Sequence, residues 1–211
     1  MALLVGYEGL IWLTNASHRN LADEWLSRIL VWAHPYEWAV SLGMVLVGLA
    51  YVYGIRKDKG SLESWVFGLM LVEAALWAIA IFKLLPLLSG YLRLHMQLNW
   101  LSREFWEAIA QCLGAGFYEE LLFRVLIVEA LLLIFSGIAL KKNLPAHYVL
   151  AWMLSAMVFS ALHFLYEPPT RYAFAYRMLF GLVMSGLYML RGFGITAWTH
   201  ALYDMYVLWW G

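Results

Sequence analysis

Two adjacent carboxylates and an arginine interrupt an apolar stretch of the chain, in the segment YEELLFR at residues 118–124. A helix turns by about 100° per residue, so Glu120 and Arg124 lie on one face, within about 40° of each other. Glu119 points about 100° away from Glu120, toward a different neighbour. The spacing predicts an ion pair between Glu120 and Arg124 and leaves Glu119 for chemistry. The alternative is that Glu120 and Arg124 form a purely structural ion pair. This alternative does not explain why Glu119 is also present.

Two later apolar segments carry polar residues at the same helical spacing. In FSALHF, Phe159 and His163 are four residues apart, so the phenyl ring can pack against the imidazole; in HALYD, His200 and Asp204 share a face. A lone histidine in a helix is more often a core residue than a catalyst. Ionisable groups on three apolar helices, however, are expected to face the protein interior or a water-filled cavity. We therefore expect Glu119, His163 and His200 to converge on one cavity, where a carboxylate could activate water.

The composition requires a membrane around these residues. The chain has 211 residues, of which 64% are hydrophobic and 13% charged, and its mean hydropathy is +0.71. Soluble domains average about 45–50% apolar and about 25% charged residues. The twelve Trp and thirteen Tyr fit aromatic belts at the two membrane interfaces. The formal net charge of zero disfavours nucleic acid as a partner.

The fold class predicted from this pattern is all-α, a polytopic membrane helix bundle. A transmembrane helix needs about 20 apolar residues. Six stretches qualify, at residues 36–55, 62–85, 106–140, 147–166, 172–190 and 194–210.

The domain boundaries follow from these stretches. Residues 1–35 are predicted to form a short apolar segment and a helix lying in the membrane interface, and residues 36–211 the bundle, with the motif-bearing core at about 106–210. The interfacial helix is predicted because an apolar stripe recurs at helical spacing with charged residues off it. The stripe is Leu21, Trp25, Ile29 and Trp32, and the charged residues are Arg19, Asp23 and Arg28. We expect no chemistry from this segment.

The motifs, taken in order, resemble those of the CPBP family of intramembrane proteases. EELLFR has the EExxxR form, FSALH the FxxxH form, and HALYD is similar to the HxxxN form. The family includes CAAX prenyl endopeptidases, bacteriocin-processing and self-immunity proteins, and sorting-type processing enzymes. The resemblance covers about residues 106–210 and departs from the prenyl-protease pattern at Asp204, where the family has asparagine.

The resemblance implies roles for the motif residues. Glu119 would be the general base that activates water together with His163. Glu120 and Arg124 would form a supporting pair, and His200 would complete the polar site. Asp204 would be protonated, or would act on His200, or would leave the oxyanion donor to another residue, because an ionised aspartate cannot donate a hydrogen bond.

The involvement of a metal is open at this level. Glu119, His163 and His200 are acceptable zinc ligands, and the family has been argued to contain both metallopeptidases and glutamate-type peptidases. The sequence favours a glutamate-type mechanism without a cofactor, with zinc as the alternative. Ser160 and Cys112 have no obvious base partner, which disfavours a covalent mechanism.

The leading hypothesis is therefore an intramembrane endopeptidase. It would hydrolyse a peptide bond in a membrane-anchored or hydrophobic terminal segment of a protein substrate, within the lipid bilayer of a prokaryotic cell membrane. One alternative is a non-enzymatic immunity or scaffold protein that binds a peptide partner. Another is a proton-coupled transporter, which is disfavoured because no internal repeat is evident. The sequence does not indicate an oligomeric state.

Overall fold

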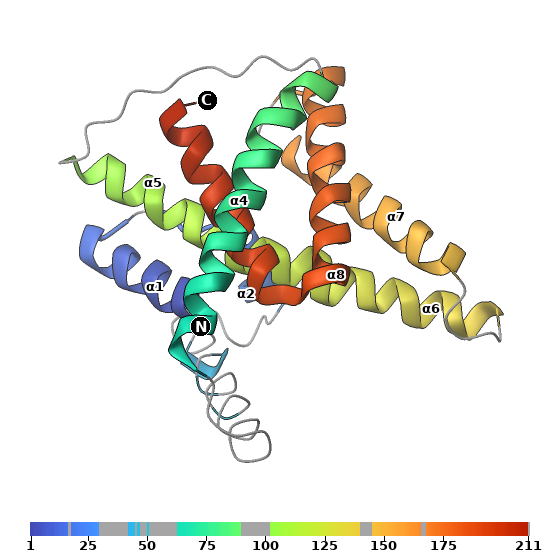
Figure 1. The fold of residues 1–211 in the computed structure, drawn as a ribbon, viewed down its shortest axis with the longest axis horizontal. Helices are drawn as coiled ribbons and strands as arrows, with labels where there is room; N and C mark the ends of the chain where they lie inside the picture. Colours follow the sequence, from blue (N-terminus) through green and yellow to red (C-terminus); the bar gives the residue numbers. More distant parts are fainter. Residues whose placement is uncertain are drawn as a thin grey trace.

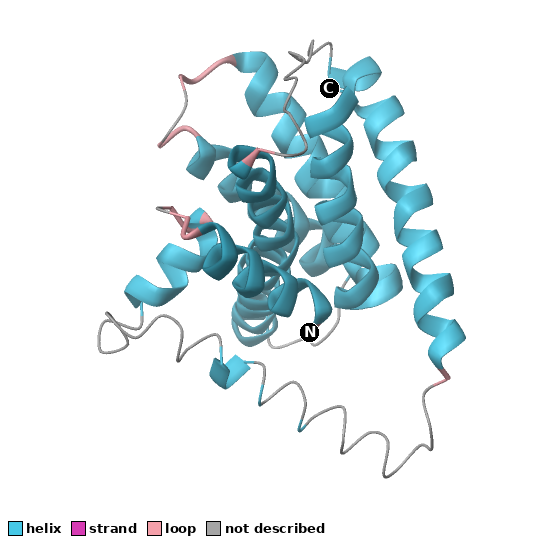
Figure 2. Ribbon diagram, turned by 90° about the vertical axis from the view of Figure 1, so that its left-hand side faces the viewer, coloured by secondary structure: helices cyan, strands magenta, loops and turns pink. Residues whose placement is uncertain are grey.

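The part of the chain that the computed structural model describes is helical throughout. It comprises residues 1–16, 18–29, 63–89, 102–139, 145–165 and 168–210, with positions 42–44, 46 and 50. Figure 2 shows helices and loops in this part and no strand. The all-α prediction is confirmed. The helices are α1 (Ala2–Thr14), α2 (Leu21–Ile29), α4 (Ser64–Ser89), α5 (Arg103–Gly114), the π-helical segments η2 (Ala115–Glu119) and η3 (Leu121–Val128), α6 (Glu129–Ala139), α7 (Pro145–His163) and α8 (Arg171–Trp210).

Three of the described helices are long and apolar enough to cross a membrane: Trp65–Leu87, Pro145–His163 and Arg171–Trp210. The first two correspond to the stretches predicted at 62–85 and 147–166. The stretch predicted at 106–140 is divided among four consecutive elements, α5, η2, η3 and α6. The stretch predicted at 36–55 lies mostly outside the described residues. The chain is an integral membrane protein.

The last two predicted spans are the two arms of α8. The helical path breaks at Gly192, where φ is 77° and ψ is 176°. In Figure 1 the chain turns back near the α8 label, and the second arm, in red, returns toward the C-terminus. The break falls between the predicted spans 172–190 and 194–210.

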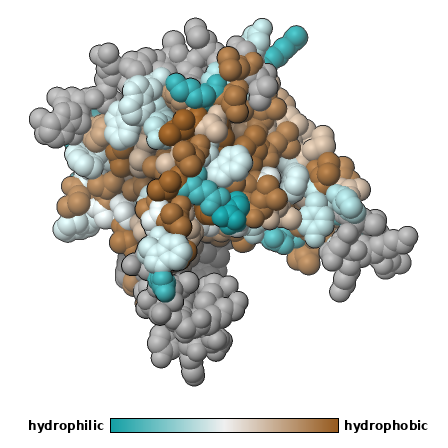
Figure 3. Space-filling model, in the orientation of Figure 1, coloured by the Kyte–Doolittle hydropathy of each residue, from teal (hydrophilic) through white to brown (hydrophobic). Residues whose placement is uncertain are grey.

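Helix α8 is the centre of the bundle, with α4 and α7 packed against it. The opposite side of α4 is apolar and exposed, with Trp65, Phe67, Leu69 and Leu76 each more than half exposed. Brown, hydrophobic side chains accordingly predominate over the face of the molecule seen in Figure 3. Such a surface is suited to lipid.

The N-terminal helices pack against the motif-bearing part of the chain, and their predicted place in the membrane interface stays a prediction. Helix α1 packs along α5 and buries Leu3, Leu4 and Tyr7, as Figure 1 also shows for the two helices. Helix α2 contacts η2. The carboxylate-bearing Asp23, expected on the outer, polar side, is only 2% exposed. Asp23 is turned inward because it meets the Tyr7 hydroxyl of α1, whereas Arg28 on the same helix remains exposed.

Segment η2 approaches the second arm of α8 at Gly116. A Cβ atom at this position would lie 2.5 Å from the carbonyl oxygen of Ala197 and 2.7 Å from the Cβ of Ala201. Both atoms belong to α8, so the absence of a side chain sets the distance between the two elements. Glu119 is the last residue of η2 and Glu120 follows it, so this contact brings both to the arm that carries His200.

Replacing Gly116 with alanine should therefore separate η2 from α8. We expect a loss of about 1–3 kcal/mol of stability, as for other overpacked interiors. Thermal unfolding of the purified protein in detergent measures the loss. The matched control is Gly137→Ala on α6, where a new Cβ would meet nothing within 4 Å. Equal melting temperatures for the two variants would contradict the assigned contact.

Candidate active site

Glu120 joins the first motif to the last one, on α8. It lies at the junction of η2 and η3, and its side chain is fully buried. His200 Nδ1 lies 2.6 Å from Glu120 Oε1, and Arg124 Nε lies 3.2 Å from Oε2. An ionised carboxylate can only accept hydrogen bonds, so Nδ1 is the donor. The ion pair expected from the sequence is present, and Glu120 also binds His200, which the sequence spacing does not predict.

Arg124 is completely buried and is surrounded by aromatic rings. Its guanidinium lies 4.9 Å from the ring centre of Phe159 and 5.9 Å from that of Phe123. Its nitrogens make no hydrogen bond within the part of the chain that the structure describes. The charge is therefore balanced by the ion pair with Glu120 and by the faces of these rings. Phe159 thus contacts the supporting pair as well as His163.

His200 is held in a fixed orientation. Its ring packs 4.8 Å from the ring of Phe180, and Nδ1 is committed to Glu120. Its Nε2 then lies 4.0 Å from Glu119 Oε2 and 3.5 Å from Asp204 Oδ2. Of the three roles considered for Asp204, this position agrees with the one in which the carboxyl acts on His200.

Glu119 and His163 line one small cavity. The cavity has a volume of about 20 Å³, which exceeds the roughly 10–15 Å³ needed to hold one water molecule. His163 Nδ1 lies 2.7 Å from the carbonyl oxygen of Phe159, so Nδ1 carries a proton and a neutral ring would keep its lone pair on Nε2. Of the three residues expected to converge, Glu119 and His163 line this cavity, whereas His200 does not line it and lies 4.0 Å from Glu119 on α8.

Two features of the N-terminal segment at this site were missed by the sequence analysis. The other walls of the cavity include Leu21, Ala22 and Trp25 of α2. The side-chain amide of Asn20 donates to Glu119 Oε1 at 3.3 Å. The sequence around Asn20 indicates only a local role, because asparagine directly before a helix is a common N-cap. Nothing in the sequence relates Asn20 to a glutamate 99 residues away.

A buried polar network attaches this segment to the motif helix. Tyr7 donates to Asp23 at 3.0 Å, and Arg19 pairs with both Asp23 and Glu8. Tyr118, the residue before Glu119, donates to the same Glu8 carboxylate. Burial raises the pKa of the Asp23 carboxyl, and the Arg19 guanidinium beside it opposes that shift.

Glu119, His163 and His200 were considered as zinc ligands. Among the residues that the structure describes, no three His, Cys, Asp or Glu side chains are placed to hold a metal ion in this arrangement. His200 directs Nδ1 to Glu120, and His163 directs Nδ1 to the Phe159 carbonyl. Metal-bound histidines commonly donate their other ring N–H in the same way, so the choice between a glutamate-type and a zinc-dependent mechanism stays a prediction.

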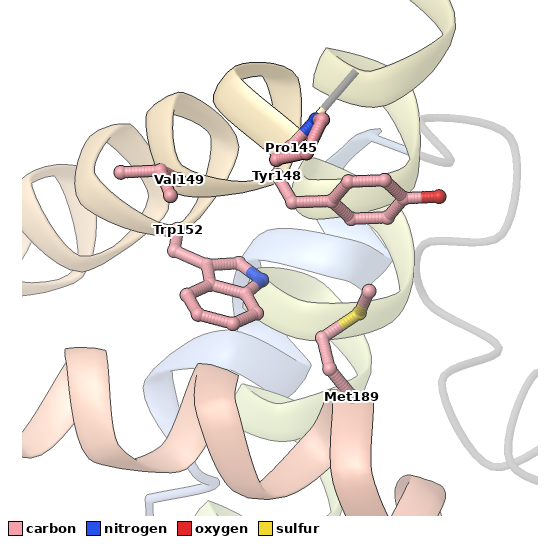
Figure 4. Close-up of a pocket in the computed structure, with 5 residues that line it drawn as sticks. All are labelled: Pro145, Tyr148, Val149, Trp152 and Met189. Atoms are coloured by element: carbon pink, nitrogen blue, oxygen red, sulfur yellow. The ribbon is translucent and has the colours of Figure 1, made fainter. Parts of the chain in front are cut away.

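A larger apolar pocket lies away from the motifs. It has a volume of about 430 Å³. Figure 4 shows the side chains that surround it, from α7 and from the first arm of α8: Pro145, Tyr148, Val149, Trp152 and Met189. None of the predicted site residues lines it.

A comparison with known protein families finds one match. The family described as type II CAAX prenyl endopeptidase Rce1-like matches residues 99–206. The match includes all three motifs and leaves out α1, α2 and Asn20. No curated protein and no solved structure matches the chain significantly.

The contribution of the buried Glu120–Arg124 ion pair to stability can be tested by mutation. Arg124→Leu should lower stability by about 3–5 kcal/mol, because Glu120 would keep a buried charge without its cation. The double variant Glu120→Gln with Arg124→Leu should recover much of that loss. Thermal unfolding in detergent distinguishes the two. If Arg124→Leu alone melts like the wild type, the pair does not stabilise the bundle.

Proposed function

We propose that this chain, which belongs to the Rce1-like family of type II CAAX prenyl endopeptidases, hydrolyses a peptide bond with a water molecule that Glu119 activates. Family membership makes the chain a CAAX-type intramembrane protease. The observation that carries the role of Glu119 is the cavity it shares with His163, whose volume of about 20 Å³ suits one water molecule. A base must lie within hydrogen-bonding reach of the proton that it removes.

In the proposed reaction, Glu119 takes a proton from water as the water oxygen attacks the carbonyl carbon of the substrate. The carbon–nitrogen bond then breaks, and the proton passes to the leaving amine. His163 orients the water through Nε2, since its Nδ1 is engaged by the Phe159 carbonyl at 2.7 Å. His200 is a second proton carrier beside Glu119, held there by Glu120 at 2.6 Å. The pathway forms no covalent enzyme intermediate.

The proposed substrate is a membrane-anchored protein with a hydrophobic terminal segment. The family description points to a prenylated CAAX terminus. An apolar exterior and a buried polar cavity favour a substrate that approaches from the bilayer. The proposed setting is a prokaryotic cell membrane.

A kinetic comparison tests the role of Glu119. The probe is an internally quenched peptide with a prenylated CAAX terminus, mixed with the purified protein in detergent or lipid. Glu119→Gln should lower kcat by about 10²–10⁴-fold because the general base is lost, while the protein remains folded. The matched control is Glu129→Gln, a glutamate on the same run of helix that contacts Tyr188 instead. Full activity in Glu119→Gln would refute the proposed role.

A second prediction concerns metal dependence. We propose a glutamate-type mechanism, so cleavage of the same peptide should persist after dialysis against a strong chelator. Zinc added back should not increase the rate. Activity that disappears on chelation and returns with stoichiometric zinc would instead assign Glu119, His163 and His200 to a metal.

A further inference from the structure

The N-terminal segment contributes a polar side chain to the site from outside the region that matches the family. We propose that Asn20 is a positioning residue, which fixes the orientation of the Glu119 carboxylate through its side-chain amide. The contact joins Asn20 Nδ2 to Glu119 Oε1 at 3.3 Å, and both residues are buried, at 6% and 9% exposure. This inference rests on the proposed function of Glu119.

Three other hydrogen bonds hold Asn20 in place. Its Oδ1 accepts from the backbone N–H of Ala22 at 3.0 Å, as an N-cap of α2. Its own backbone N–H donates to the Tyr7 hydroxyl at 2.9 Å, and its carbonyl accepts from the Glu24 N–H at 3.0 Å. Because Oδ1 is engaged by α2, the amide presents its nitrogen to Glu119. The Asn20 Nδ2–H group can therefore donate a hydrogen bond to the ionised Glu119 carboxylate, which can only accept one.

The packing of α5 against the N-terminal segment allows this approach. A Cβ atom at Gly114 would lie 2.7 Å from the Tyr7 ring and 3.0 Å from the Cβ of Asn20. Any larger residue would displace the segment that carries the amide. The network of Tyr7, Asp23, Arg19, Glu8 and Tyr118 anchors the same segment beside Glu119.

The two carboxylate oxygens of Glu119 therefore face different partners. Oε1 accepts from Asn20, and Oε2 lies 4.0 Å from His200 Nε2. Without the amide, the carboxylate could rotate about its last side-chain bond and lose its alignment with the cavity. Misplacement of a reacting group by about 1 Å can reduce the rate about 10²-fold.

The competing interpretation is that Asn20 serves only as the cap of α2. Asn20→Ser separates the two roles, because serine is also a good N-cap but is too short to reach Glu119. We expect kcat to fall by about 10- to 100-fold with KM nearly unchanged, since the base is misaligned and substrate binding is not. Asn20→Asp, which keeps the shape and the cap but presents an acceptor, should also lose activity.

The control is Gln111→Ala. Gln111 Nε2 donates to the His18 carbonyl at 3.1 Å, so it also ties the N-terminal segment to α5, but no contact with Glu119 is involved. This variant should retain the wild-type kcat. If Gln111→Ala and Asn20→Ser have the same kcat on the quenched prenylated peptide, the inference is overturned and the segment has a docking role only.

A second measurement is independent of catalysis. The melting temperatures of Asn20→Ser, Glu119→Ala and the double variant form a double-mutant cycle. Non-additive shifts support the contact between the two side chains, and additive shifts overturn it. If the wild type fails to cleave the peptide, the proposed function fails on this substrate, while the cycle still decides the contact.

Discussion

The buried carboxylate of Glu120 is the interaction on which the arrangement of the site depends. It receives His200 of α8 through one oxygen and lies against Arg124 of its own helix through the other. A charge removed from water is costly unless it is paired, so these groups stabilise one another only when η2, η3 and α8 are in contact. Gly116 permits that contact, and Phe159 of α7 covers the arginine. Folding of the bundle and assembly of the site are therefore the same event.

The position of Glu119 follows from this constraint. With Glu120 fixed between a histidine and an arginine, the preceding residue, Glu119, lines the cavity between α2 and α7. In the proposed function, Glu120 holds the site together and Glu119 performs the chemistry. His200 links the two, because each of its ring nitrogens faces a different glutamate.

Local patterns in the sequence predicted much of this arrangement, and long-range contacts accounted for what was missed. The residues four apart, Glu120 and Arg124, were paired correctly because helical spacing is local. The break at Gly192 falls between the two stretches, 172–190 and 194–210, that were predicted as separate spans. Segments η2 and η3 were missed because π-helical turns leave no periodic signal. The burial of Asp23 and the contact of Asn20 with Glu119 depend on partners far along the chain, so local spacing did not predict them.

The most direct test of Glu119 as the water-activating base compares protein termini by mass spectrometry in host cells. One culture makes the wild type and another makes Glu119→Gln at an equal level in the membrane. The account predicts new termini that depend on the wild type, and these would identify the substrate and the cleaved bond together. If the host proteins have identical termini in the two cultures, the result would contradict the role of Glu119 as the base. It would favour a non-enzymatic binding role for the same cavity.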